Sequence, residues 1–408
     1  MDTAPIIDTR YNRILTLKDL VLLGLSMTIG SGVFVLLDDV AKNSHNLVWL
    51  AMMLAGIMSL LTALSYGELA SIFKNNMGEY GYVRAVSNDT VANTVGLGIL
   101  ISDVFVIATI ALGLGNYLSK STGFNVTTIA VVAIVVLNYF NYHGIKTATT
   151  ASRYVLYIKL MVIVTIIVAS LCGNSPKEEL FSIKNATPNG ISTATIIGLF
   201  AYVGFNNMTN FTEETINPEV TIGRSIMYTV IIVTILYTLI SFATLFVMNS
   251  TELSQTSTPL ATITGKLFGK YGFQLLMVLA VISLIDTLLV TCVSESRYIH
   301  AFLSRVSPRF GQQDMDQKHQ TPYLSIILLV AIASLIIYTF KKIGTTAIYG
   351  NLLIMAIFII VNLVVIILRY QQPDLERPFK IPFNLGKLPI PSVLAVLFGV
   401  YGVYKIIT

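Results

Sequence analysis

Long apolar stretches recur along almost the whole chain and alternate with short polar segments. A helix that crosses a membrane needs about 20 predominantly apolar residues, and eleven stretches approach that length. Their predicted ranges are 17–41, 48–73, 92–118, 126–144, 152–173, 191–212, 225–248, 272–302, 322–340, 345–369 and 391–407. The pattern predicts an all-α polytopic membrane protein in which residues 1–408 form a single transmembrane domain.

Two of the predicted spans carry residues that weaken a helix near its centre. In the first span Gly30 and Gly32 flank Ser31, and in the sixth span Gly204 precedes Asn206. A glycine in a helix interior costs about 1 kcal/mol relative to alanine. An unwound segment must be buried or line a cavity, because lipid cannot satisfy its backbone groups. For one such motif close helix packing is the simpler interpretation, but two breaks in corresponding positions favour a binding site.

The two breaks also predict how the spans are organised. Each break opens a block of five spans, which is the pattern of two inverted repeats. The repeats cover about 17–173 and 191–369, and the helix at 391–407 lies outside them. The N-terminus of a half-helix offers amide hydrogens and a positive dipole end to a carboxylate, and freed carbonyls accept an ammonium group.

Charged residues make up 12% of the chain, about half the share that is usual in soluble domains. The net charge of +5 is dispersed over short loops, which argues against a nucleic-acid partner. With the N-terminus in the cytoplasm, ten arginines fall on the cytoplasmic side or at its boundary, as positively charged loops prefer. They are Arg10, Arg13, Arg84, Arg153, Arg224, Arg297, Arg305, Arg309, Arg369 and Arg377. Several lysines would face outward and are less decisive. Eleven spans then place the C-terminus outside, and we expect a multi-pass protein of the plasma membrane.

Catalytic and metal-binding patterns are not visible in the sequence. The four histidines are scattered, and Cys172 and Cys292 fall inside apolar stretches without partners at metal-ligand spacing. We therefore expect no enzymatic activity, no cofactor, no metal and no disulfide-linked accessory subunit.

Several segments carry a resemblance to a known family. They are 29–34 (IGSGVF), 68–70 (ELA), 78–84 (GEYGYVR), 200–205 (FAYVGF) with Glu213, Glu214, Asn217, Pro218 and Arg224, the pair Ser296 and Arg297, and 377–380 (RPFK). In this order they resemble the amino acid–polyamine–organocation superfamily over nearly the whole chain, and its cationic amino acid transporters most of all. The eleven predicted spans are one fewer than the family's usual twelve.

The resemblance implies a secondary transporter of amino acids that works by alternating access, with membrane lipid and a small amino acid as its partners. It implies that the α-carboxylate meets the backbone amides of Gly30, Ser31 and Gly32. The α-amino group would meet backbone carbonyls of the two broken helices, those of Thr28, Ile29, Phe200, Ala201 and Val203. Phe200 matches the aromatic residue that closes over the substrate, and an ordinary core aromatic is the alternative.

Lys159 lies within the fifth predicted span, where a charge is costly. Its ammonium could reach the cytoplasmic interface along its flexible stem. The resemblance implies instead that Lys159 occupies the place of a sodium ion, as in members that do not use sodium. Transport would then be sodium-independent and either proton-coupled or an exchange.

Two further acids, Asp103 and Asp286, lie inside predicted spans. Either could receive the side chain of a cationic amino acid, or pair with Lys159, and an internal salt bridge or a proton relay is an equal alternative. In the family comparison Ser102 stands opposite a third-helix glutamate, and Asn206 stands where some members carry an acid. These departures weaken the prediction of cationic specificity and leave the proton carrier open.

Glu213 and Glu214 follow the sixth span, where acids oppose the helix dipole and call for a cationic partner. Arg84, Arg224 and Arg297 are the candidate partners in an inner gate, and solvated loop pairs are the alternative. Two other functions stay open: a transporter of polyamines or other organic cations, and a receptor or scaffold that does not transport.

Overall fold

The computed structural model describes residues 12–30, 32–33, 36–143, 145–183, 186–256, 258–316 and 318–407, without the side chains of residues 120, 121 and 145–151. Ser31, one of the predicted substrate-binding residues, lies outside the described residues, and so does Arg10.

Helices account for nearly all of the regular structure in the described residues, which confirms the predicted fold class. The α-helices are α1 (Leu17–Thr28), α3 (Leu37–Ser44), α4 (Val48–Ile72), α5 (Gly78–Arg84), α6 (Asp89–Thr122), α7 (Val126–Tyr142), α8 (Ile145–Leu171), α9 (Pro188–Leu199), α10 (Pro218–Thr244), α11 (Ser250–Gln255), α12 (Pro259–Val306), α13 (Pro308–Asp314), α14 (Tyr323–Phe340), α15 (Ile343–Gln371) and α16 (Ile390–Ile407). The 3₁₀ helices are η1 (His45–Leu47), η2 (Phe200–Tyr202) and η3 (Asn206–Glu214).

Strands are confined to two small antiparallel hairpins. In one, β1 (Met315–Asp316) pairs with β2 (Thr321–Pro322), and in the other β3 (Asn384–Leu385) pairs with β4 (Leu388–Pro389). Both hairpins lie in connections between helices, so neither contributes a layer to the bundle.

Eight helical stretches of the described residues are long and apolar enough to cross a membrane. They are Leu37–Ile72, Asp89–Ser119, Ser152–Leu171, Pro218–Thr244, Pro259–Val306, Tyr323–Phe340, Ile343–Gln371 and Ile390–Ile407. Three predicted spans do not appear among them. The fourth corresponds to α7, which is apolar but only 17 residues long, and the first and sixth are discontinuous.

The first predicted span is interrupted at the glycines that the sequence singled out. α1 ends at Thr28, Ile29 leaves the helical region with φ −82° and ψ 80°, and α3 begins at Leu37. α1 begins with a capping box, because the Thr16 side chain accepts from the Asp19 amide and the Asp19 side chain accepts from the Thr16 amide.

The sixth span is interrupted as well. α9 ends at Leu199, a single 3₁₀ turn follows, and Val203 adopts extended backbone with ψ 140° before η3 begins at Asn206. Gly204 has φ 123°, a conformation that side-chain-bearing residues rarely adopt, so the glycine is required at this turn.

The eighth span differs from its predicted range of 272–302. α12 runs from Pro259 to Val306, and its helix bends at Gly269, which has φ 69° and ψ −163°. The part before Gly269 is more polar than the rest, so a search for apolar stretches misses it.

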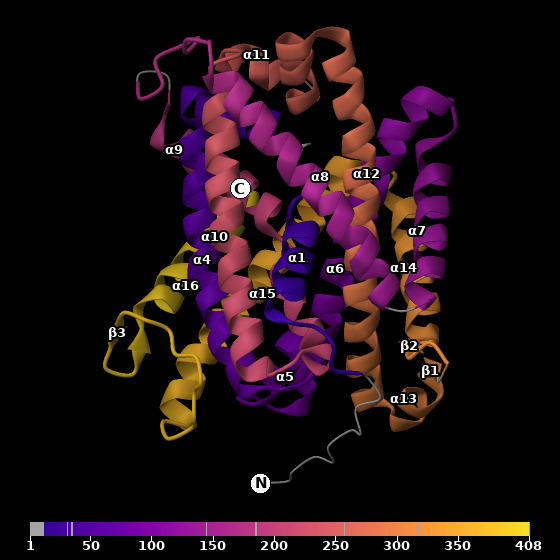
Figure 1. Cartoon of the computed structure of the whole chain (residues 1–408). Helices are drawn as coiled ribbons and strands as arrows, with labels where there is room; N and C mark the ends of the chain where they lie inside the picture. The colour runs from indigo at the N-terminus through magenta and orange to yellow at the C-terminus, as the bar shows by residue number, and fades with distance from the viewer. Residues whose placement is uncertain are drawn as a thin grey trace.

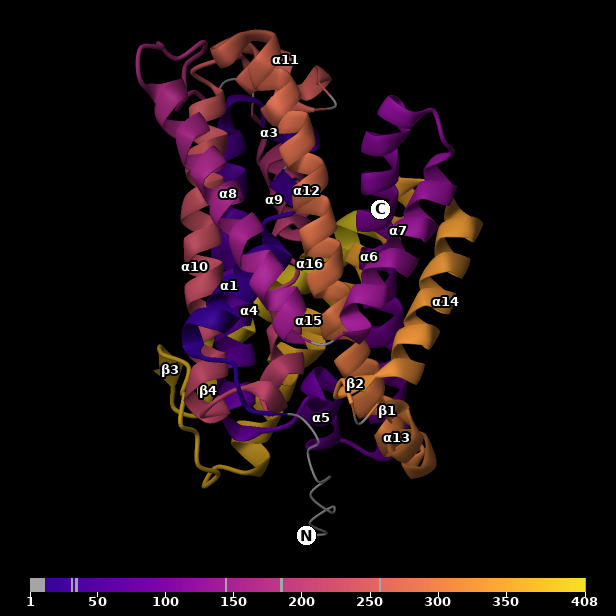
Figure 2. The same cartoon turned by 45° about the vertical axis from the view of Figure 1, so that its right-hand side comes forward.

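α1 lies inside the bundle and packs against α10, α12 and α8. α5 and α13 lie at one end of the molecule, and α11 lies at the opposite end (Figure 1). After a turn of 45°, α6, α7 and α14 are seen together on one side, with α1, α8 and α10 on the other (Figure 2). The two interrupted spans therefore meet in the interior rather than at the surface.

Candidate functional site

The two helix breaks are in direct contact. A Cβ atom built on Gly32 would overlap the backbone Cα of Ala201, and one built on Gly204 would lie 3.1 Å from the carbonyl of Met27. Thr28, Ile29, Phe200 and Ala201 are all buried. The two breaks thus pack directly against each other, and the absence of a side chain on Gly32 and Gly204 permits this approach.

Three of the carbonyls predicted to face an ammonium group already accept hydrogen bonds. The Tyr237 hydroxyl donates to the Thr28 carbonyl at 2.9 Å, and the Gly30 amide donates to the same oxygen at 3.0 Å. The Ile29 carbonyl accepts from the Lys159 ammonium at 3.1 Å. On the other side, the Phe200 carbonyl accepts from the Val203 amide at 3.2 Å. These contacts fix the orientation of the broken backbone in this conformation.

The Lys159 side chain is buried inside the bundle. Its Nζ atom lies 2.6 Å from Oδ2 of Asp286 and 3.3 Å from Oγ1 of Thr287, in addition to the Ile29 carbonyl. The Lys159 and Asp286 side chains are only 3% and 2% exposed. An ammonium has three hydrogens to donate, and three oxygens accept them here.

Other residues of the chain therefore already donate hydrogen bonds to the Asp286 carboxylate. Its second carboxylate oxygen accepts a hydrogen bond from the Ser152 hydroxyl. Of the alternatives for Asp286 that the sequence left open, this conformation contains the pairing with Lys159. The ammonium is held by oxygens of the first and eighth spans, which is the arrangement that a small cation would need.

The other predicted polar residues of the centre are also buried. Asn206 accepts from the Gly204 amide at 3.2 Å and donates to the side chain of Asn207, so it stabilises the turn at the sixth-span break. The Ser102 hydroxyl is buried and has no hydrogen-bond partner. Asp103 lies beside Glu295, an acid of α12 that the sequence analysis did not single out. An acid within the apolar range 272–302 was the signal that could have identified Glu295.

The predicted inner gate is assembled only in part. Nε of Arg297 lies 3.5 Å from Oε2 of Glu214, and both side chains are buried. Glu213 instead accepts from the Asn76 amide at 3.3 Å. The structure brings neither of the other two arginines to these glutamates: Arg84 pairs with Asp89 at 2.7 Å, and Arg224 is exposed on α10.

A second buried ion pair near the same end was missed by the sequence analysis. Oε1 of Glu68 on α4 accepts from Nε of Arg369 on α15 at 2.8 Å. Nε of Arg377 lies 3.3 Å from the same oxygen. The Ile381 amide donates to the same carboxylate at 2.8 Å. This pair joins the second span, the tenth span and the following loop. Glu68 and Arg369 are 301 residues apart in the sequence.

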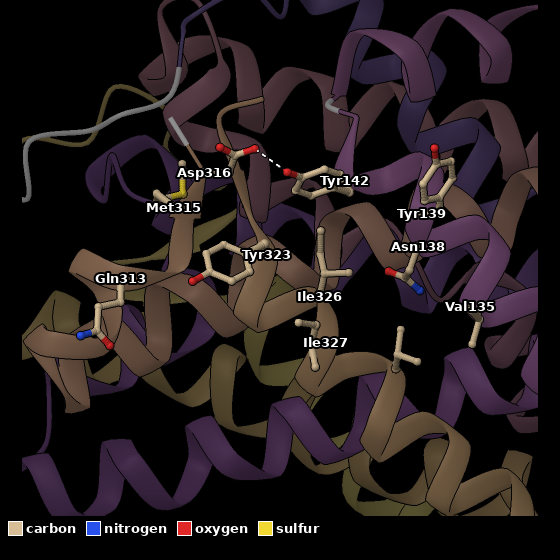
Figure 3. Close-up of a pocket in the computed structure, with 11 residues that line it drawn as sticks. Val135, Asn138, Tyr139, Tyr142, Gln313, Met315, Asp316, Tyr323, Ile326 and Ile327 are labelled. Atoms are coloured by element: carbon tan, nitrogen blue, oxygen red, sulfur yellow. Dashed lines mark hydrogen bonds between the residues drawn. The ribbon is translucent and has the colours of Figure 1, made fainter. Parts of the chain in front are cut away.

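A cavity of about 780 Å³ lies away from the helix breaks, between α7 and α14 (Figure 3). Its walls include strongly exposed apolar and aromatic side chains, such as Tyr139 and Ile327. The carboxylate at its edge, Asp316, accepts from the Tyr142 hydroxyl at 2.7 Å (Figure 3). Apolar side chains exposed on two spans are expected where lipid covers the protein.

The fold and the site together define a polytopic membrane transporter with two discontinuous helices at its centre. The amino acid permease family matches residues 15–407, and the chain belongs to this family. It is 24% identical to the branched-chain amino acid permease BcaP of Bacillus subtilis, over 94% of this chain and 86% of BcaP. It is 27% identical to the human cystine/glutamate transporter, over 88% and 74% of the two chains, and 24% identical to the methylthioribose transporter of Bacillus subtilis, over 95% and 88%. The protein is an amino acid transporter of the membrane.

Proposed function

We propose that the protein carries amino acids across the plasma membrane by alternating access and without sodium. The observation that supports this proposal most is the buried ammonium of Lys159, which lies 3.1 Å from the Ile29 carbonyl at the first break and 2.6 Å from Asp286 on the eighth span. A fixed positive charge already holds the first break against the eighth span. A sodium ion at the same oxygens would be repelled by that charge.

The substrate's backbone groups bind at the two breaks. The α-carboxylate accepts from the amides of Gly30, Ser31 and Gly32, and the α-amino group donates to carbonyls of the first and sixth spans. Each carbonyl oxygen has two lone pairs. The Ile29 carbonyl accepts from Lys159 and has a second lone pair for a substrate hydrogen, whereas the Thr28 carbonyl already accepts from both Tyr237 and Gly30 and would have to exchange one of these donors. The close contact of Gly32 with Ala201 supports a site that both breaks share.

Phe200 closes the site from the side of α9. Its side chain is buried at the junction of α9 and η2, where the backbone changes from α to 3₁₀ geometry. Rotation of this aromatic ring would admit or retain a substrate. At the other end, the buried contact between Glu214 and Arg297 joins η3 to α12 and serves as an inner gate.

Alternating access follows from two inverted repeats, about 17–173 and 191–369, that move against each other around the fixed site. The N-terminus is cytoplasmic and the C-terminus lies outside.

The contacts at the two breaks concern the backbone groups of the substrate and do not select its side chain. The similar proteins are named for branched-chain amino acids, for cystine and glutamate, and for methylthioribose. Lys159 and Ser152 already engage the Asp286 carboxylate, so a cationic substrate would have to displace them there. We therefore propose amino acids in general as the cargo, and cationic ones as one class to be tested.

Counterflow in proteoliposomes tests this function. Proteoliposomes that contain the purified protein are loaded with one unlabelled amino acid at a time, and entry of the same amino acid in labelled form is measured. A polyamine and methylthioribose are tested in the same way. We expect exchange of at least one amino acid class, lost in Ser31→Trp because the bulky side chain fills the carboxylate site. Entry of the polyamine alone, or of no compound, would contradict the proposal.

A further inference from the structure

Three buried acids from three different elements lie close enough to act on one another electrostatically. Asp103 lies on α6, Glu295 on α12 and Glu79 on α5. Each of these residues is no more than 2% exposed. The carboxyl groups of Asp103 and Glu295 lie within hydrogen-bonding reach of each other, and Glu79 is close enough to influence both electrostatically.

Among the residues that the structure describes, the titratable groups that act electrostatically on this pair carry no positive charge. They are Glu79 on α5, Tyr66 on α4, and Tyr298 and Cys292 on α12 itself. Among the described residues, neither lysine nor arginine forms an ion pair with any of the three acids. Arg297, two residues beyond Glu295, is directed to Glu214 and Asn141 instead.

The two carboxyl groups of the pair lack a hydrogen-bond donor. Ionised carboxylates only accept hydrogen bonds, and neither oxygen of Glu295 nor Oδ1 of Asp103 has a donor among the surrounding groups. Two adjacent buried carboxylates without a counter-ion are strongly destabilising. One proton on the pair removes one negative charge and supplies the missing donor, because the protonated carboxyl group then donates to its neighbour.

A metal ion fits the site less well than a proton. The described residues contain no group of three or more His, Cys, Asp or Glu side chains placed to hold a metal ion. Glu79 is instead engaged elsewhere, since it accepts from the Tyr66 hydroxyl at 2.8 Å. A single proton is therefore the ligand that fits between the two carboxyl groups.

The pair is connected to the sixth-span break. Glu79 also lies close to the side chain of Asn206, which in turn accepts from the Gly204 amide at 3.2 Å. Glu295 follows Asp286 by nine residues on α12, which is roughly 13 Å along a helix. A rearrangement of the break would alter the contacts of Glu79 and the access of water to the pair.

We propose that Asp103 and Glu295 together form the proton-binding site that couples amino acid transport to a proton gradient, with Glu79 linking the pair to the sixth-span break. The proposal rests on the transport function proposed above. In one conformation the pair takes up a proton from water and becomes a carboxyl–carboxylate pair with one negative charge. In the other conformation the same O–H bond breaks and the proton returns to water on the opposite side.

Glu295→Gln tests the coupling, because its amide can donate to Asp103 as a protonated Glu295 would, but it cannot release a proton. For one proton per amino acid, a gradient of one pH unit supports about tenfold accumulation. We expect the wild type and Glu376→Gln, which changes an exposed loop acid, to accumulate substrate in response to the gradient. In Glu295→Gln and in Asp103→Asn, the ratio of gradient-driven accumulation to counterflow exchange should fall about tenfold. Unchanged ratios, or a loss confined to cationic amino acids, would overturn the proposal.

Infrared difference spectroscopy of the purified protein tests proton binding without any transport. A pH change should produce a carboxyl C=O stretching signal in the wild type and in Glu376→Gln, and the signal should be absent from Glu295→Gln and Asp103→Asn. A signal that persists in both variants would overturn the proton site while leaving the transport function intact. Failure of all uptake and exchange, with the signal present, would instead contradict the transport function alone.

Discussion

The ammonium of Lys159 on α8 lies 2.6 Å from the carboxylate of Asp286 on α12, and both side chains are almost fully buried. Removing one member of a buried ion pair leaves a charge without a partner, which costs about 3–5 kcal/mol. We expect Lys159→Met to lower the thermal unfolding temperature markedly and to abolish uptake, because the first break loses its contact with the eighth span.

The matched control is the exposed pair formed by Lys266 and Glu252. Exposed ion pairs contribute about 0–1 kcal/mol, so Lys266→Met should change the unfolding temperature little. Combining Lys159→Met with Asp286→Asn should recover part of the lost stability, since neither charge then remains. Strictly additive losses in the double variant would show that the two residues do not act as a pair.

The contact between the two breaks gives a second prediction. A methyl group on Gly32 would overlap the Cα atom of Ala201, so Gly32→Ala should impair uptake by forcing the breaks apart. Gly98 on α6 has open space around it, so Gly98→Ala is the control and should stabilise that helix by about 0.5–1 kcal/mol. Equal uptake by the two variants would refute a site shared by both breaks.

The proposed inner gate gives a third prediction. Arg297→Met leaves Glu214 buried without its partner and should lower both stability, by about 3–5 kcal/mol, and the uptake rate. Arg224→Met changes an exposed arginine of α10 and should alter stability by no more than about 0.5 kcal/mol. If Arg224→Met impaired uptake as strongly as Arg297→Met, the assignment of Arg297 to the gate would be wrong.

The loop that carries β1 gives a prediction about pH. Hydrogen bonds from His319 and Tyr142 stabilise the Asp316 carboxylate and lower its pKa from 3.8 to about 2. Because the pKa is lower in the folded state, the stabilising contribution is complete above pH 3.8 and is lost as the pH falls toward 2. Asp316→Asn should therefore unfold at a lower temperature than the wild type at neutral pH, and the difference should shrink in acid. A difference that stays constant with pH would contradict this.

Much of the fold could be predicted because apolar length and helix-breaking residues are local properties of the sequence. The break at Gly30 and the turn at Gly204 follow from glycine's conformational freedom and appear where expected. The beginning of α12 was missed because the segment before Gly269 does not have the apolar character of a span.

The pairing of side chains could not be predicted in the same way. Lys159 and Asp286 are 127 residues apart, and Glu68 and Arg369 are 301 residues apart. Whether such residues meet depends on the rotation and crossing of helices, which apolar length does not specify. For the same reason Glu295 and Asp103 appeared unrelated in the sequence, and Arg84 and Arg224 could not be distinguished from Arg297 as partners of Glu214.

We propose that the Lys159 ammonium takes the place of a sodium ion. Initial uptake of a labelled amino acid into proteoliposomes tests this, with sodium replaced by choline at the same pH and membrane potential. We expect the same rate of uptake in both media. A strict requirement for sodium would contradict it.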